Sequence, residues 1–274
     1  MSPETNPIIG FSATPFPCLV LRHGKDKPDL VSSDMNNHLD SNHLGELVIF
    51  SGSAVNLYKL IMYKYKYNGV SIIHSPRLRT YETSILCTRI FGEAGIPVDL
   101  NQEPLLQELD QGRFLIDKKL MTPDHKYLPL VNAWQAYVNN LNDEEIDYRY
   151  GQKPKSDKDR FSEIFISPGE SQRELLSRIY LFLQNLLQTD SAKLHIVVTH
   201  ATVIDELQRI ISAIKTSNQN ALAYLGDGSF TRKLQSLGHR IRLKPAQAIA
   251  LSLNDLRYAA DILKKESDHI SNHE

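Results

Sequence analysis

Three short apolar runs, each followed at once by basic or imidazole side chains, constrain the fold of this 274-residue chain most strongly. They are residues 19–21 before Arg22, His23 and Gly24, residues 70–73 before residues 74–79, and residues 194–198 before Thr199 and His200. Runs of this length predict buried strands. In parallel α/β sheets the carboxyl ends of the strands share one edge, where ligands bind. The pattern therefore predicts an α/β fold with a functional site at that edge.

The second apolar run is followed by a helix start signal. Ser75 is a good N-cap residue and Pro76 suits the first helical position, and apolar residues then continue at helical spacing as far as Gly92. The free N–H groups of such a helix start, together with Arg77 and Arg79 in its first turn, favour a bound phosphate.

The remaining pattern alternates helices and strands. We expect a helix that opens near residue 43 behind Ser41 or Asn42, is interrupted at residues 51–53 and ends at Asn68-Gly69. Further expected elements are strands 97–100, 194–198 and 248–253 and helices 130–141, 171–187 and 203–214, the second of which opens with a capping box at Ser171 and Glu174. The whole chain, residues 1–274, is predicted to be one domain. Residues 113–168 are expected to form an inserted cap, and residues 217–244 an insertion before the last strand.

Composition excludes several classes of function. A net charge of −1 gives no electrostatic case for binding nucleic acid or an anionic membrane surface. We expect no stretch that approaches the roughly 20 apolar residues of a membrane span, and no secretory leader, so a cytoplasmic protein is predicted. Cys18 and Cys87, the two cysteines, lie in apolar segments and are expected to be reduced core thiols.

Two imidazoles and two guanidiniums gathered at one sheet edge would repel one another unless an anion neutralises them. A phosphoryl group fits best, because it is tetrahedral and matches the guanidinium fork. The same positive field disfavours a charged imidazole, so a neutral histidine can attack phosphorus. The leaving oxygen then needs an acid, and spacing alone does not choose one among the many Asp and Glu residues.

Five segments, taken in order, resemble the histidine phosphatase superfamily, in the branch that contains the cofactor-dependent phosphoglycerate mutases. They are Arg22-His23-Gly24, Ser75-Pro76-x-x-Arg79 with Thr83, Leu106-x-Glu108-x-x-x-Gly112, Gly169-Glu170-Ser171, and Val197-Val198-Thr199-His200. The resemblance implies a three-layer α/β/α sandwich and a reaction without metal or other cofactor. It implies that His23 is the phosphorylated nucleophile, that Glu108 is the general acid and base, and that Arg79 and His200 bind the phosphoryl group.

The chain also departs from that family. Lys25 stands where the mutases carry Glu or Gln, and Arg77 stands where Leu is usual, so both are candidate substrate-binding residues. Ala201 and Thr202 follow the second histidine in place of Gly. His74 and His195, inside strands, are expected to be core histidines, and the histidines outside the three strand ends show no metal-ligand spacing.

We therefore expect a metal-independent phosphatase that acts through a phosphohistidine on His23, with Arg22, Arg79 and His200 clamping the phosphoryl group. A phosphoryl mutase and a phosphate-binding relative with weak catalysis are the alternatives. The expected partner is a phosphorylated small molecule, with a phosphoprotein also open. The substrate and the oligomeric state, a homodimer included, stay open.

Overall fold

The structure is a computed structural model that describes residues 7–9, 18–26, 38–109, 113–114, 122–139, 165–167, 172–189, 192–216 and 243–271. The strands are β1 (Ile8–Ile9), β2 (Cys18–Arg22), β3 (Gly69–His74), β4 (Val98–Gln102), β5 (Arg113–Phe114), β6 (Phe165–Ser167), β7 (Lys193–Thr199) and β8 (Ala248–Leu251). The α-helices are α1 (Leu44–Tyr65), α2 (Leu78–Glu93), α3 (Leu128–Asn139), α4 (Gln172–Leu187), α5 (Ala201–Thr216) and α7 (Leu253–Ser271). Two 3-10 turns are η1 (Ser41–His43) and η2 (Pro104–Leu106).

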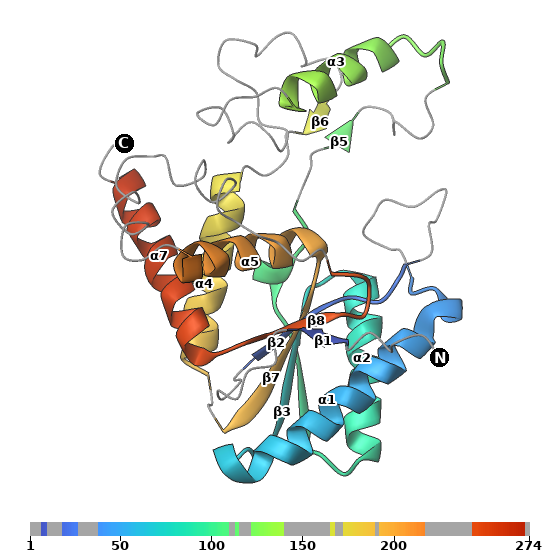
Figure 1. Ribbon diagram of the computed structural model, residues 1–274. Coiled ribbons are helices and arrows are strands. Elements are labelled where there is room, and N and C mark those ends of the chain that lie inside the picture. The colour runs from blue at the N-terminus through green and yellow to red at the C-terminus, as the bar shows by residue number, and fades with distance from the viewer. Residues whose placement is uncertain are drawn as a thin grey trace.

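Six strands form one sheet in the order β1-β8-β2-β7-β3-β4 (Figure 1). The pairs β2–β7, β7–β3 and β3–β4 are parallel, and β8 runs antiparallel to β2. The predicted mostly parallel α/β sheet is thus confirmed. β5 and β6 pair with each other in a separate antiparallel ribbon.

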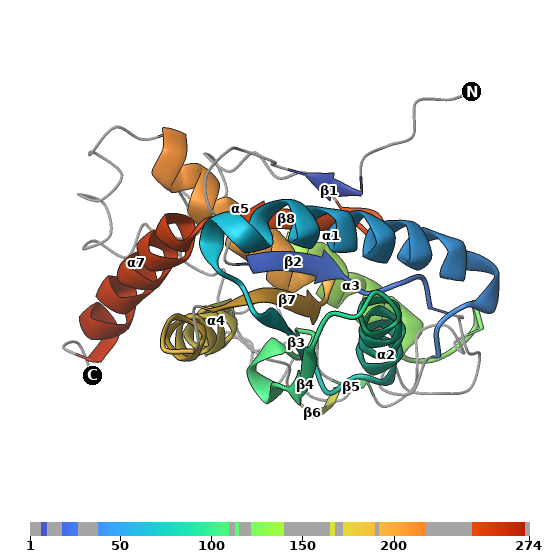
Figure 2. The ribbon, with the colours of Figure 1, turned by 90° about the horizontal axis from the view of Figure 1, so that it is seen from below.

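Helices cover both faces of the main sheet, which makes three layers (Figure 2). One core cluster joins residues of α1 and α2 to Leu19 and Leu21 of β2, and the other joins α4, α5 and α7 to Cys18 and Val20. Alternate residues of one strand therefore serve opposite cores, as the twofold repeat of a strand requires. This burial on both faces explains why the strands are continuous apolar runs.

Helix α1 differs from its prediction at both ends and in the middle. It runs unbroken through Ser51-Gly52-Ser53, because Ser51 is buried and its hydroxyl meets Cys87 Sγ at 3.4 Å across the contact with α2. It ends at Tyr65, before the C-cap residue Lys66 with its left-handed backbone (φ 57°), rather than at Asn68-Gly69. At its start Asp40, not Ser41 or Asn42, caps the preceding turn η1.

The segment Ser41–Tyr65 is also long and apolar enough to cross a membrane by length and composition, so the expectation that no such stretch exists was wrong. In the structure 44% of its apolar stretch is buried, and Phe50, Leu57 and Tyr58 pack into the core against the sheet. A helix that covers a sheet accounts for this apolar composition. The absence of a membrane partner stays a prediction.

Other helices and strands differ from their predicted positions or were not predicted. Helix α2 begins at Leu78 with Arg77 as its N-cap, two residues later than Ser75-Pro76 predicted. The short strand β1 and the helix α7 have no counterpart in the sequence analysis, whereas β4, β7, α4 and α5 lie where strands and helices were expected. Within the segment predicted as a cap, β5, β6 and α3 are described and lie together, away from the main sheet (Figure 1). The single-domain boundaries and the role of residues 113–168 and 217–244 stay predictions.

Candidate active site

The main sheet brings three strand ends together. β2 and β3 flank β7 in parallel, with Arg22 opposite Thr199 and His74 opposite Val198. The backbone N–H of His23 donates to Thr199 O at 3.1 Å, and that of Ser75 donates to Val198 O at 3.1 Å. The residues that follow the three strands therefore start from fixed, adjacent positions at one sheet edge.

The turn after β2 holds His23 in one tautomer. Its ring is 5% exposed, and Nδ1 lies 2.6 Å from Gly24 O. A carbonyl oxygen only accepts, so Nδ1 carries the proton and Nε2 keeps its lone pair. Burial, followed by the nearby His200 and Arg79, lowers the pKa of His23 to about 3. His23 is therefore a neutral imidazole that carries no proton on Nε2 over the ordinary pH range.

Gly24 allows the close packing of this turn. A Cβ placed on it would lie 2.7 Å from Leu47 Cδ1 and 3.1 Å from Leu39 Cδ2. Its N–H donates to Thr83 Oγ1 at 3.1 Å, and that hydroxyl donates to Arg79 O at 2.7 Å. The contact fixes the turn of His23 against the first turns of α2, which explains why the predicted second block includes Thr83.

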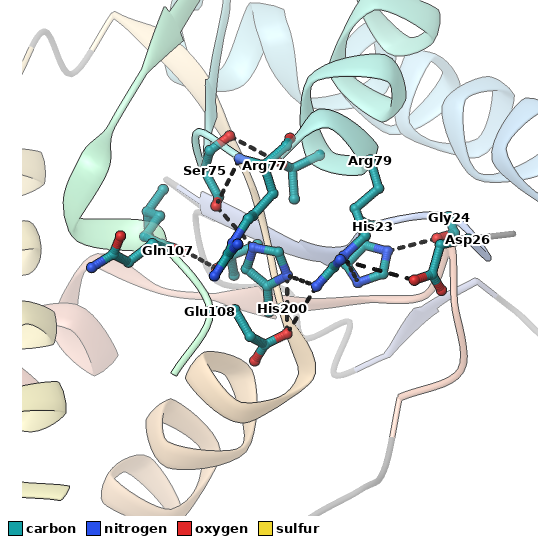
Figure 3. A network of polar contacts seen from close by, with 12 residues as sticks. His23, Gly24, Asp26, Ser75, Arg77, Arg79, Gln107, Glu108 and His200 are labelled. Atoms are coloured by element: carbon teal, nitrogen blue, oxygen red, sulfur yellow. Dashed lines mark hydrogen bonds and ion pairs between the residues drawn. The ribbon is translucent and has the colours of Figure 1, made fainter. Parts of the chain in front are cut away.

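The Arg79 guanidinium lies at the centre of the cluster (Figure 3). It is 4% exposed, and its Nε donates to His23 Nε2 at 3.2 Å. Its Nη2 lies 3.4 Å from Glu108 Oε2 and 3.3 Å from His200 Nδ1, and its Nη1 lies 3.9 Å from Asp26 Oδ2. One planar fork thus touches both imidazoles and both carboxylates.

His200 is fully buried between a hydroxyl and a carboxylate. Nδ1 lies 3.1 Å from Glu108 Oε2, and Nε2 lies 2.8 Å from Ser75 Oγ. Because the carboxylate accepts, we assign the proton to Nδ1, so the Ser75 hydroxyl donates to Nε2. Burial lowers the pKa of His200, Glu108 partly offsets this, and Arg79 and Arg77 lower it further.

Glu108 reaches the cluster because its segment is anchored on both sides. Leu106 and Leu109 are buried, Thr199 Oγ1 donates to Leu106 O at 2.8 Å, and Arg178 donates to Leu105 O at 2.6 Å. Burial alone would raise the pKa of Glu108, but hydrogen bonds and charges from His200, Thr202 and Arg79 outweigh it and lower the pKa to about 2. Glu108 is therefore a carboxylate before substrate binds.

Glu103 and Asp110 are the acids nearest to Glu108 in the sequence, and the structure distinguishes Glu108 from Glu103. The Glu103 carboxylate accepts from Leu105 N at 3.0 Å and caps η2. Asp110 lies outside the described residues. Of Glu103 and Glu108, Glu108 is thus the acid that lies against His200 and Arg79.

The other predicted substrate-binding residues are Arg22, Lys25 and Arg77. Arg22 Nη1 donates to Leu243 O at 2.6 Å. Lys25 is exposed, with Nζ 3.1 Å from His43 Nε2. Arg77 points toward His200 on the side away from His23 (Figure 3).

Sequence reasoning missed two members of the site. Ser75 was assigned only to a helix cap, but its hydroxyl also contacts His200. Asp26 was not singled out, although it follows His23 by three residues and its charge bears on the pKa of that histidine. Proximity in the chain was the available signal for Asp26. The core histidines are confirmed as buried, with His74 Nδ1 bonded to Ser75 O at 2.7 Å and His195 Nε2 3.3 Å from Thr189 Oγ1.

His23, Glu108 and His200 offer three potential metal-ligand atoms within 4.8 Å of one another. The Arg79 guanidinium contacts all three residues, at 3.2 to 3.4 Å. A permanent positive charge at that place opposes a cation and favours an anion. The arrangement thus fits a bound phosphoryl group better than a metal.

A model of the histidine phosphatase superfamily (branch 1) matches residues 133–235, which contain β7, His200 and α5. The match confirms the resemblance for the part of the chain that carries the second histidine. The sheet then places His23, from the amino-terminal part of the chain, 5.2 Å from His200 between ring centroids.

Solved structures similar to this chain include phosphatases and a mutase. Phosphoglycerate mutase from Bacillus anthracis str. Sterne is 15% identical, with 89% of this chain and 95% of that chain covered and a TM-score of 0.44. Alpha-ribazole phosphatase from Shigella flexneri is 15% identical, with 86% and 95% covered and a TM-score of 0.44. Mycobacterial glucosyl-3-phosphoglycerate phosphatase is 15% identical, with 71% and 78% covered and a TM-score of 0.43. These likenesses are too distant to carry an argument about substrate, and no curated protein matches the chain.

Proposed function

We propose that the protein is a phosphomonoesterase that works through a phosphohistidine on His23. The observation that carries the proposal is the neutral His23 ring, whose Nε2 lone pair lies 3.2 Å from the Arg79 guanidinium. The candidate nucleophile, His23 Nε2, thus lies next to a guanidinium that can bind an anion. A phosphoryl group bound by Arg79 would lie within reach of that lone pair.

In the first step, the Nε2 lone pair of His23 forms a bond to phosphorus while the bond from phosphorus to the ester oxygen breaks. Charge on the equatorial oxygens is stabilised by Arg79 and by the Nδ1–H of His200. Arg22 is proposed as a further clamp, since a guanidinium has five N–H donors and can keep its bond to Leu243 O. Lys25, at the exposed rim, is proposed to meet the outer part of the substrate.

Glu108 is proposed to carry the proton for both steps. A bound phosphoryl dianion repels the carboxylate and raises its pKa, so Glu108 takes the proton that the ester monoanion brings, whose second pKa is about 6. Glu108 then protonates the leaving oxygen. In the second step it accepts a proton from water, whose oxygen bonds to phosphorus as the N–P bond breaks and the electron pair returns to His23.

The first test is hydrolysis of phenyl phosphate in excess chelator by the wild type, by His23→Ala and by Arg79→Ala. His125→Ala is the control, because the half-buried ring of His125 accepts a hydrogen bond from Tyr127 N and lies outside the cluster. We expect no turnover from His23→Ala and wild-type turnover from His125→Ala. Loss of the charge-assisted contacts of Arg79 should lower kcat/KM roughly ten- to several-hundred-fold.

A quench into alkali, which preserves phosphohistidine, identifies the intermediate. Labelled phosphate on the wild type and not on His23→Ala supports the proposal. A labelled enzyme that is stable in water and passes its phosphate to an added alcohol would instead indicate a mutase. Tight phosphate binding with neither label nor turnover would indicate a phosphate-binding protein without catalysis.

A further inference from the structure

Arg77 has no role in the proposed reaction, although it is close in sequence to Arg79. It is the N-cap of α2, and its backbone N–H lies 3.5 Å from Ser75 Oγ. The same hydroxyl lies 2.8 Å from His200 Nε2. The main chain of Arg77 is therefore anchored through one hydroxyl group to the buried wall of the site.

The side chain of Arg77 continues along that wall. Figure 3 shows its guanidinium beside the His200 ring, with Gln107 next to it, on the opposite side of the ring from Arg79 and His23. Its charge is one of the causes that lower the pKa of His200, as a nearby cation does. His23, Arg79, His200 and Arg77 thus follow one another across the site.

The order of these residues separates the roles of the two arginines. Arg79 contacts His23 and two carboxylates, so its place is at the phosphoryl group. Displacement at phosphorus is in line, which puts the leaving group on the side away from the attacking His23 Nε2. Arg77 lies on the side of the His200 ring that faces away from His23 (Figure 3). A guanidinium there pairs best with a carboxylate or a phosphate, and with five donors it can do so while keeping a contact within the protein.

We propose that Arg77 forms a second anion subsite at the place of the leaving group, an inference that rests on the proposed phosphatase activity. The substrate is then a phosphomonoester whose alcohol part carries an anionic group, a carboxylate or a second phosphate. Arg77 selects among substrates, whereas Arg79 serves every phosphoryl group that enters.

The test compares phenyl phosphate with phenyl phosphates that carry a carboxyl or a phosphono group at ring position 3 or 4. The quantity measured is the ratio of kcat/KM between each charged ester and phenyl phosphate, in the wild type and in Arg77→Leu. Intrinsic reactivity of the esters cancels when the two ratios are compared. We expect Arg77→Leu to lower the ratio for the best charged ester roughly ten- to hundred-fold, as for a lost charge-assisted contact.

Two further variants make the comparison specific. Arg77→Lys keeps the charge without the fork and should retain part of the preference. Arg89→Leu removes the same charge from an exposed position of α2, where Arg89 pairs with Glu93 at 2.8 Å, and should leave every ratio as in the wild type. Equal ratios for the wild type and Arg77→Leu with all charged esters would overturn the subsite. The comparison of the carboxyl and phosphono esters shows which anion the subsite takes.

A binding measurement keeps the subsite separate from the proposed activity. Calorimetry compares benzylphosphonate with its carboxyl and phosphono derivatives on the wild type and Arg77→Leu. A preference for the charged ligands that disappears in Arg77→Leu supports the subsite even if no ester is hydrolysed, in which case only the phosphatase proposal fails. Hydrolysis of phenyl phosphate without any Arg77-dependent preference, in turnover or in binding, leaves the phosphatase and removes the subsite.

Discussion

The hydroxyl of Ser75 should act as a positioning group for His200. Both side chains are fully buried, and Ser75 Oγ is the donor that the described structure places at His200 Nε2, at 2.8 Å. Ser75→Ala leaves that nitrogen buried without its donor, at a cost of about 1–3 kcal/mol. The proton of His200 can then move from Nδ1 to Nε2, which removes the donor that faces Glu108 and the phosphoryl group.

If this cost falls mainly on the transition state, kcat/KM for an aryl phosphate drops roughly 5- to 150-fold. Ser84→Ala is the matched control, because Ser84 is equally buried on α2 but its hydroxyl donates only to Thr80 O at 2.8 Å. The assay is steady-state hydrolysis over a range of pH, with the melting temperature of each variant measured alongside. Ser75→Ala and Ser84→Ala with equal kcat/KM would refute the positioning role, whatever their stabilities.

Two further predictions concern stability. His23 has a folded pKa of about 3 against an ordinary value of 6.5, so the unfolded chain binds more protons between those values. The stability that neutral His23 contributes is therefore fully present above pH 6.5 and is lost as pH falls toward 3, and melting curves should show a smaller loss on acidification for His23→Gln than for the wild type. Gly24→Ala, whose Cβ would lie 2.7 Å from Leu47 Cδ1, should lower stability to urea by about 1–3 kcal/mol. Gly45→Ala, on α1 with no atom within 4 Å of the new Cβ, should instead stabilise by up to about 1 kcal/mol, and a loss as large as that of Gly24→Ala would contradict the packing argument.

Much of the site was predictable because strands buried on both faces are continuous apolar runs. The position where such a run stops indicates where the strand ends. Arg22 is the last residue of β2, and His23 and His200 directly follow β2 and β7, so the sheet alone brings them to one edge. The choice of Glu108 came from the resemblance to a known family. Spacing could not have made it, because the turn η2 decides which of two nearby acids faces inward.

The errors have a common physical cause. Ser75 has the local signature of a helix cap, yet its hydroxyl is engaged by a histidine 125 positions later in the chain, and α2 begins after it. Ser51-Gly52-Ser53 has the signature of a break, yet α1 continues because its buried face packs against α2 and the sheet. In both places a tertiary contact outweighs a local preference.

The antiparallel strand β8 decides when this protein can finish folding. β2 has two hydrogen-bonded neighbours, β7 and β8, and both come from the last third of the chain. The residues just before β8 also hold the turn that carries His23, since Arg22 N donates to Gln247 O at 3.0 Å and Ala246 N donates to Arg22 O at 3.2 Å. During synthesis, the strand that bears the nucleophile must wait with both edges open until nearly the whole chain has left the ribosome. An unfinished chain would expose those edges to other unfinished chains, so truncation before residue 243 should yield aggregation rather than a smaller enzyme.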